Sequence, residues 1–75
     1  MSDLDYAVIL LPSTSHAMRA EAALRRAGIG CKMIPVPRHL SSDCGVCIRV
    51  ARQDREAARI ALDAAGVECE SIHDY

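Results

Sequence analysis

Residues 6–17 read YAVILLPSTSHA, and this stretch decides the fold of the 75-residue chain. Residues 6–11 are continuously apolar and too short for a stable helix, which is typical of a strand buried on both faces. Pro12 interrupts the run, and three hydroxyl residues follow it that can each cap a helix: Ser13, Thr14 and Ser15. The chain is therefore predicted to begin with a central strand that leads directly into a helix.

A helix is predicted from residue 16 to residue 27, because apolar side chains recur there at spacings of three and four. They are Ala17, Ala20, Ala23, Leu24 and Ala27. Gly28 follows in the position that glycine favours after a helix end. Residues 31–36 then predict a second strand, and Pro35 places it at an edge, because proline cannot donate to a sheet ladder.

The second half of the chain repeats this order. Residues 46–50 alternate between apolar and other side chains as a third strand does. Asp54 is the predicted cap of a second helix, which ends before Gly66. Residues 67–72 predict a last strand, and Glu68 and Glu70 suit its exposed edge.

The predicted element order, β-α-β-β-α-β, is that of the α+β ferredoxin-like sandwich. This fold has a four-stranded antiparallel sheet in the order 4-1-3-2, with both helices on one face. We expect a single domain over residues 1–75. The other sheet face has no helix cover, and the first strand presents apolar residues to both sides. We therefore expect a homodimer through this open face, with a monomer as the alternative.

Composition excludes several classes of protein. The net charge is −1 and two tyrosines are the only aromatic residues, so a basic footprint and a stacking platform for nucleic acid are both missing. No apolar run approaches the ~20 residues of a membrane span. The first five residues, MSDLD, are acidic where a signal peptide is basic. We expect a cytoplasmic protein, in which four cysteines are thiols, metal ligands or catalytic groups more often than disulfides.

The predicted topology brings the start of the first helix beside the loop of residues 37–45. Cys44 is the sharpest candidate in this loop, because a helix N-terminus and nearby cations stabilise a thiolate. Gly45 leaves room for an approaching sulfur donor. The alternative is that Cys44 is only a small turn residue. The other residues of the predicted cluster are Ser13, Thr14, His16, Arg38, His39, Ser41 and Ser42. His16 is either a hydrogen-bond donor or proton carrier, or a residue that caps the helix locally or packs on the strand end.

The remaining cysteines have other predicted roles. Cys47 completes a C-x-x-C with Cys44, but it enters a strand and points to the face without helices, so it is either a resolving thiol or a core or interface cysteine. Cys31 and Cys69 fall on opposite edge strands, too far apart for a disulfide or a shared metal ion, and are predicted to be buried small hydrophobes. We expect no metal site and no cofactor, although a site of Cys44, Cys47, His39 and one outside ligand stays open.

Several segments together resemble a family of small bacterial proteins described as selenium/sulfur carrier-like, whose function is not established. They are STSHA at 13–17, AE at 20–21, AGI at 27–29, IPVPR at 34–38 and SSDCG at 41–45. The resemblance implies a cysteine, matched here by Cys44, that accepts sulfur or selenium and passes it on. It also implies a protein donor similar to a cysteine desulfurase, and a protein acceptor. Cys47 departs from the family pattern, which typically has a small apolar residue there.

Three functions remain open from the sequence. The first is a carrier that holds a persulfide or selenosulfide on Cys44, rather than an enzyme that turns over. The second is a regulatory module that binds a small anion or a protein at the same helix N-terminus. The third is a small redox protein that uses Cys44 and Cys47.

Overall fold

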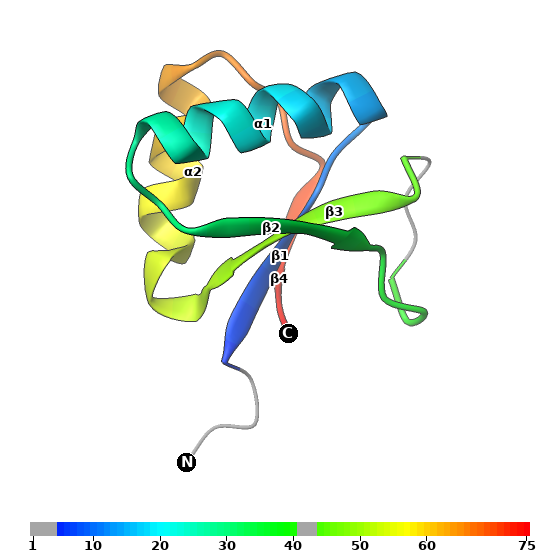
Figure 1. Ribbon diagram of the computed structural model, residues 1–75. Coiled ribbons are helices and arrows are strands. Elements are labelled where there is room, and N and C mark those ends of the chain that lie inside the picture. The colour runs from blue at the N-terminus through cyan, green and yellow to red at the C-terminus, as the bar shows by residue number, and fades with distance from the viewer. Residues whose placement is uncertain (1–4, 41–43) are drawn as a thin grey trace.

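The computed structural model describes residues 5–40 and 44–75. Its four strands form one sheet in the order β2-β3-β1-β4, with every neighbouring pair antiparallel and both helices on one face (Figure 1). The elements are β1 (Tyr6–Leu10), α1 (Thr14–Arg26), β2 (Cys31–Pro35), β3 (Val46–Ala51), the 3₁₀ turn η1 (Arg52–Asp54), α2 (Arg55–Ala64) and β4 (Ser71–Asp74). The predicted ferredoxin-like α+β sandwich is confirmed, since 4-1-3-2 is the same order counted from the other edge.

Both helices end at a glycine in the left-handed region. Gly28 has φ +78° and donates to the carbonyl of Arg25, while the next residue, Ile29, donates to Leu24. Gly66 (φ +70°) and Val67 repeat the same pair of bonds at the end of α2. This is the Schellman arrangement, in which the residue after the glycine packs back onto the helix.

The second helix end explains why the predicted last strand is wrong in its position. Val67 is 4% exposed because it belongs to the cap of α2 and not to the sheet. The chain reaches the sheet only at Glu70, whose N–H donates to the carbonyl of Leu10 at 2.8 Å. β4 is an edge strand, as predicted, but it begins at Ser71, so Glu68 and Cys69 precede it.

The prediction for Asp54 is also corrected. Asp54 does precede α2, but its side chain makes no cap bond. Its backbone lies in the 3₁₀ turn, with φ −95° and ψ 2°, instead of the extended conformation that a capping side chain needs. The start of α2 is held instead by Arg55, whose guanidinium donates to Asp74 at 2.5 Å and to the carbonyl of Ile72 at 3.1 Å.

β1 separates two apolar clusters. Ala7, Ile9 and Leu11 pack on the helix side. The helices contribute Ala17, Ala20 and Leu24 from α1 and Ala58 and Leu62 from α2. The alanines let both helices approach the sheet closely. Val8 and Leu10 point to the opposite face, so β1 is buried on both sides, as its sequence predicts.

The face without helices is not bare, which corrects the premise of the dimer prediction. Val8, Leu10 and Cys47 form a second buried cluster there, with exposed fractions of 3% or less. Ile34, Val36 and Leu40 cover this cluster, because the chain after β2 turns to the side away from the helices (Figure 1). The chain thus covers part of its own open face. The homodimer through this face stays a prediction.

Neither helix of residues 5–40 and 44–75 is long and apolar enough to cross a membrane.

The packing of Leu40 on the second buried cluster leads to a prediction about stability. Leu40→Ala removes apolar atoms that pack on Val8, Leu10 and Cys47, so we expect the free energy of unfolding to fall by about 1–2 kcal/mol, because the residue is only partly buried. Chemical denaturation monitored by circular dichroism measures the change. Met18→Ala is the control, because Met18 is 63% exposed and its truncation is expected to change stability by less than about 0.5 kcal/mol. Equal effects of the two substitutions would contradict a covering role for Leu40.

Candidate functional site

Ser13 begins the site, because it caps α1. Its backbone is extended, and its Oγ accepts from the N–H of His16 at 3.2 Å. The same Oγ lies 2.6 Å from Nδ1 of His16. The imidazole tautomer with its proton on Nε2 satisfies both contacts, since the hydroxyl then donates to Nδ1 while it accepts from the backbone. His16 thus makes a local contact with the capping residue Ser13, and its predicted role as a hydrogen-bond donor or proton carrier stays a prediction.

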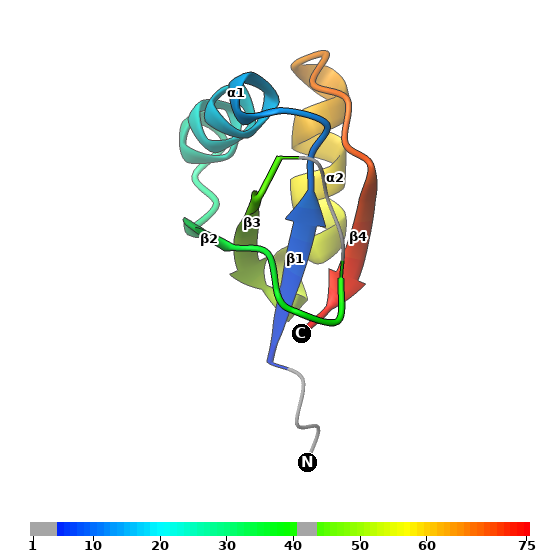
Figure 2. The ribbon, with the colours of Figure 1, turned by 90° about the vertical axis from the view of Figure 1, so that its right-hand side faces the viewer.

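The register of β1 against β3 sets the position of the site. Leu10, at the end of β1, pairs with Cys47, near the start of β3. Figure 2 shows the end of β1, the start of α1 and the chain entering β3 together at one end of the sheet. The start of α2 follows the other end of β3, where Ala51 pairs with Tyr6. Of the predicted meeting of the first helix with the loop of residues 37–45, the structure shows the part that involves Cys44.

Cys44 lies at this end of the sheet. Its Sγ is 3.9 Å from Oγ1 of Thr14, the first residue of α1. The side chain is half-buried and packs against the helix-side cluster. Gly45 follows with φ +79°, a conformation that favours glycine, and its carbonyl accepts from Val36 at 3.2 Å. The turn therefore holds a partly accessible thiol against the first turn of a helix.

The first turn of α1, which this thiol contacts through Thr14, has backbone N–H groups without a partner in the helix. The N–H groups of Thr14 and Ser15 have no partner within the helix, as at every helix start. These groups and the helix dipole give the position a partial positive charge that favours an anion. The arrangement can stabilise a negatively charged sulfur species.

Cys47 lies on the other side of the sheet. It is fully buried with Val8 and Leu10, and its Sγ is 3.9 Å from the carbonyl of Pro35. Burial raises the pKa of the Cys47 thiol, and the negative charge of a Cys44 thiolate raises it further. Cys47 thus occupies the face predicted for it, as a core residue separated from the Cys44 side chain by the sheet.

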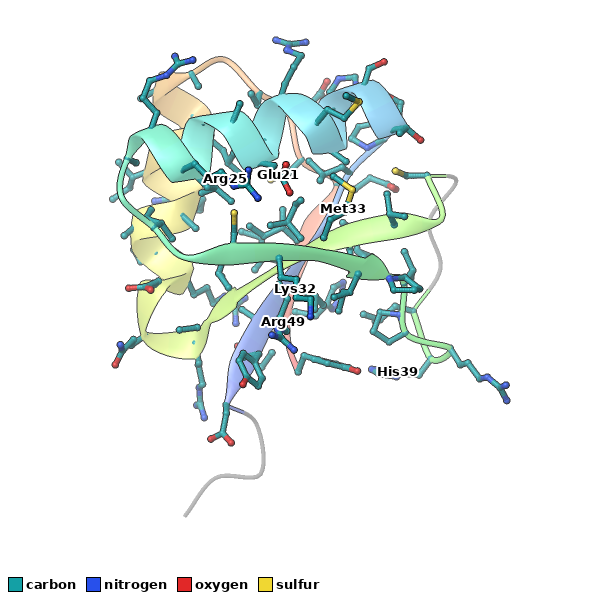
Figure 3. All side chains as sticks on the ribbon, in the orientation of Figure 1. Glu21, Arg25, Lys32, Met33, His39 and Arg49 are labelled. Atoms are coloured by element: carbon teal, nitrogen blue, oxygen red, sulfur yellow. The ribbon has the colours of Figure 1, made fainter. Side chains whose placement is uncertain are left out.

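Arg38 and His39 lie where the sequence prediction did not place them. Both are exposed, on the turn that the N–H of Leu40 closes on the carbonyl of Pro37. His39 lies on the side of the sheet away from the helices (Figure 3), whereas Cys44 packs on the helix side. The reason is Leu40, which draws this turn onto the open face. Ser41 and Ser42, also predicted site residues, fall outside the described residues.

Cys31 and Cys69 are half-buried and pack against the helix-side cluster. Burial is the main cause that raises the pKa of both thiols. Within residues 5–40 and 44–75, no three His, Cys, Asp or Glu side chains are placed to share a metal ion. Cys31 begins β2, as predicted, whereas Cys69 precedes β4 instead of lying on it.

Two further cations were not identified from the sequence. Lys32 and Arg49 lie directly opposite each other on β2 and β3, on the face away from the helices (Figure 3). The available signal was strand alternation, because each is the polar residue between two apolar neighbours.

Comparison with known proteins identifies the family of this chain. A family model with the description "Putative Se/S carrier protein-like" matches residues 5–74. Searches among curated proteins and among solved structures found no match. The matched region includes every strand and helix and the Cys44 turn. The chain therefore belongs to the Se/S carrier protein-like family.

Proposed function

We propose that this chain carries sulfur or selenium on the Cys44 thiol and passes it from one protein to another. The observation that carries the proposal is the 3.9 Å contact between Cys44 and Thr14 at the start of α1, in a chain of the Se/S carrier protein-like family. A half-buried thiol at a helix N-terminus suits an anion that must be stabilised and yet remain within reach of a partner.

The other three thiols are less suited to this role. Cys47 is fully buried, and burial raises the pKa values of Cys31, Cys47 and Cys69. A raised pKa lowers the thiolate fraction near neutral pH, and the thiolate is the nucleophile. Burial therefore makes these three thiols poorer candidates, and Cys44 is proposed as the carrier residue because of its contact with Thr14 at the start of α1.

The transfer requires no oxidant and no metal ion. The Cys44 thiolate attacks the outer sulfur of a donor persulfide, donor–S–SH. A bond forms between Cys44 Sγ and that sulfur, the sulfur–sulfur bond of the donor breaks, and the donor leaves as a thiolate. The product is Cys44–S–SH. An acceptor thiolate then attacks the outer sulfur, the bond between that sulfur and Cys44 Sγ breaks, and Cys44 leaves as a thiolate. A selenium atom in the outer position follows the same steps.

The residues around Cys44 have two proposed roles. Ser13, Thr14 and His16 organise the start of α1, which stabilises the anionic outer sulfur. Arg38 and His39, with Ser41, Ser42 and Gly45, are proposed to contact the partner proteins. Arg38 and His39 suit this role because both are exposed on a turn beyond β2. The donor would be similar to a cysteine desulfurase.

The proposal predicts that Cys44 alone acquires sulfur. After incubation with a cysteine desulfurase and cysteine, we expect the intact protein to gain the mass of one sulfur atom, and Cys44→Ser to abolish the gain. Mass spectrometry under non-reducing conditions measures it. Cys69→Ser is the matched control, because it removes a half-buried thiol whose pKa is raised and should leave the gain unchanged. A gain that survives Cys44→Ser would overturn the proposal.

The redox alternative, with Cys47 as the resolving thiol, is less favoured by the geometry. Cys44 packs in the helix-side cluster and Cys47 in the opposite one, so a disulfide would require the start of β3 to rearrange. A redox protein of this kind would form a disulfide between Cys44 and Cys47 on mild oxidation and lose two hydrogen atoms. Substitution of either cysteine would prevent this loss.

Alkylation distinguishes the two thiols directly. In the folded protein at mildly alkaline pH, we expect iodoacetamide to modify Cys44 well before Cys47, because Cys47 is fully buried. Its raised pKa also means that its thiolate forms only at a higher pH than that of an ordinary cysteine. Peptide mapping after timed quenching measures both rates, and the same reaction in denaturant should modify all four cysteines alike. Equal rates in the folded state would contradict a buried, inert Cys47.

A further inference from the structure

One row of residues crosses the open face from edge to edge. In the register of the sheet, Lys32 on β2 lies opposite Arg49 on β3, Arg49 lies opposite Val8 on β1, and Val8 lies opposite His73 on β4. Residues in such a row share one face of the sheet. Figure 3 shows Lys32 and Arg49 together on the side away from the helices. The segment that ends at Leu40 covers the neighbouring row of Ile34, Cys47 and Leu10.

Among the residues that the structure describes, the two cations of this row have no carboxylate partner. The strand positions that share their face contain no acidic residue; they are Tyr6, Val8, Leu10, Ile34, Cys47, Ala51, Ser71 and His73. Asp74 lies opposite Ala7, hence on the helix side, where it pairs with Arg55 and Arg52. Within residues 5–40 and 44–75, Lys32 and Arg49 form no ion pair. Like charges directly across a strand pair destabilise a sheet, and a bound anion would remove this repulsion.

The guanidinium of Arg49 is already oriented. Its Cζ lies over the Tyr6 ring, 4.3 Å from the ring centre, in a cation–π contact. This contact is not a hydrogen bond, so the N–H groups of the planar guanidinium can still donate to a bidentate acceptor. A hollow of about 240 Å³ adjoins the group, lined by Tyr6, Lys32, Arg49 and the backbone-rich corner of Gly30, Cys31, Val50 and Ala51. Both cationic residues therefore line the same hollow.

The size of the hollow narrows the class of ligand. Pockets for drug-sized molecules or cofactors usually begin near 300 Å³, so this one is small for them. The volume of the hollow is several times the ~30 Å³ of a water molecule, so it has room for a tetrahedral oxyanion. We propose that Lys32 and Arg49 form a binding site for a free oxyanion of the phosphate class. The site does not include Cys44, which packs on the other side of the sheet.

Titration with inorganic phosphate at constant pH and ionic strength tests the site, with amide chemical shifts measured by NMR. We expect saturable shifts at residues 30–32 and 49–51 and at Tyr6. Lys32→Gln and Arg49→Gln should each weaken binding by roughly tenfold or more, because each removes a charge-assisted hydrogen bond. Arg19→Gln, an equal change of charge on an exposed position of α1, should leave the affinity unchanged.

Lys32→Gln also gives a readout that does not depend on saturation. Without phosphate it should raise the melting temperature, because the like-charge repulsion is removed, and phosphate should then stabilise it less than the unsubstituted chain. Shifts that stay linear with phosphate concentration would overturn the site. So would unchanged affinity in the Lys32→Gln, Arg49→Gln double variant, or saturable shifts confined to the first turn of α1. Tighter binding of glycerol 2-phosphate than of phosphate would overturn the assignment to a free oxyanion.

Discussion

The burial of β1 on both faces is the constraint on which the rest of the structure depends. Ala7 and Ile9 require a cover on one side and Val8 and Leu10 on the other, yet both helices lie on a single face. Residues 5–40 and 44–75 form no third α-helix that could cover the second face. The segment after β2 covers part of it instead, through Val36 and Leu40.

This solution also determines where the reactive groups lie. Leu40 packs on the open face and Cys44 packs on the helix side, so the two ends of a short stretch of chain lie on opposite sides of the sheet. The thiol thereby meets the start of α1, while Arg38 and His39 remain with the covering turn. Cys44 and Cys47 also pack on opposite sides of the sheet, although only two residues separate them in the sequence. A C-x-x-C that enters a strand therefore differs physically from one that opens a helix.

Much of the fold could be predicted because its signals are local. The apolar run of β1, the proline of β2 and the glycines that end both helices each report the conformation of their own neighbourhood. The start of β4 could not be predicted from the residue types, because the apolar side chain of Val67 is buried at the cap of α2 and not in a strand. The same holds for the site. Helix and strand order brought Thr14 and Cys44 together, whereas the position of Arg38 depended on where Leu40 finds its apolar contacts.

Net charge conceals how the charges are distributed over this fold. The net charge of −1 is the sum over two faces that differ. On the helix side Asp74 is paired with Arg55, whereas the strand positions of the open face hold Lys32 and Arg49 and no carboxylate. Two cations are far fewer than the about six to ten phosphate contacts of a typical nucleic-acid footprint. They suffice for one tetrahedral anion, which accepts hydrogen bonds from a single fork and a single ammonium. The partly covered face therefore suits a small ligand, because Ile34, Val36 and Leu40 pack on the apolar cluster while Lys32 stays exposed and Arg49 half-buried.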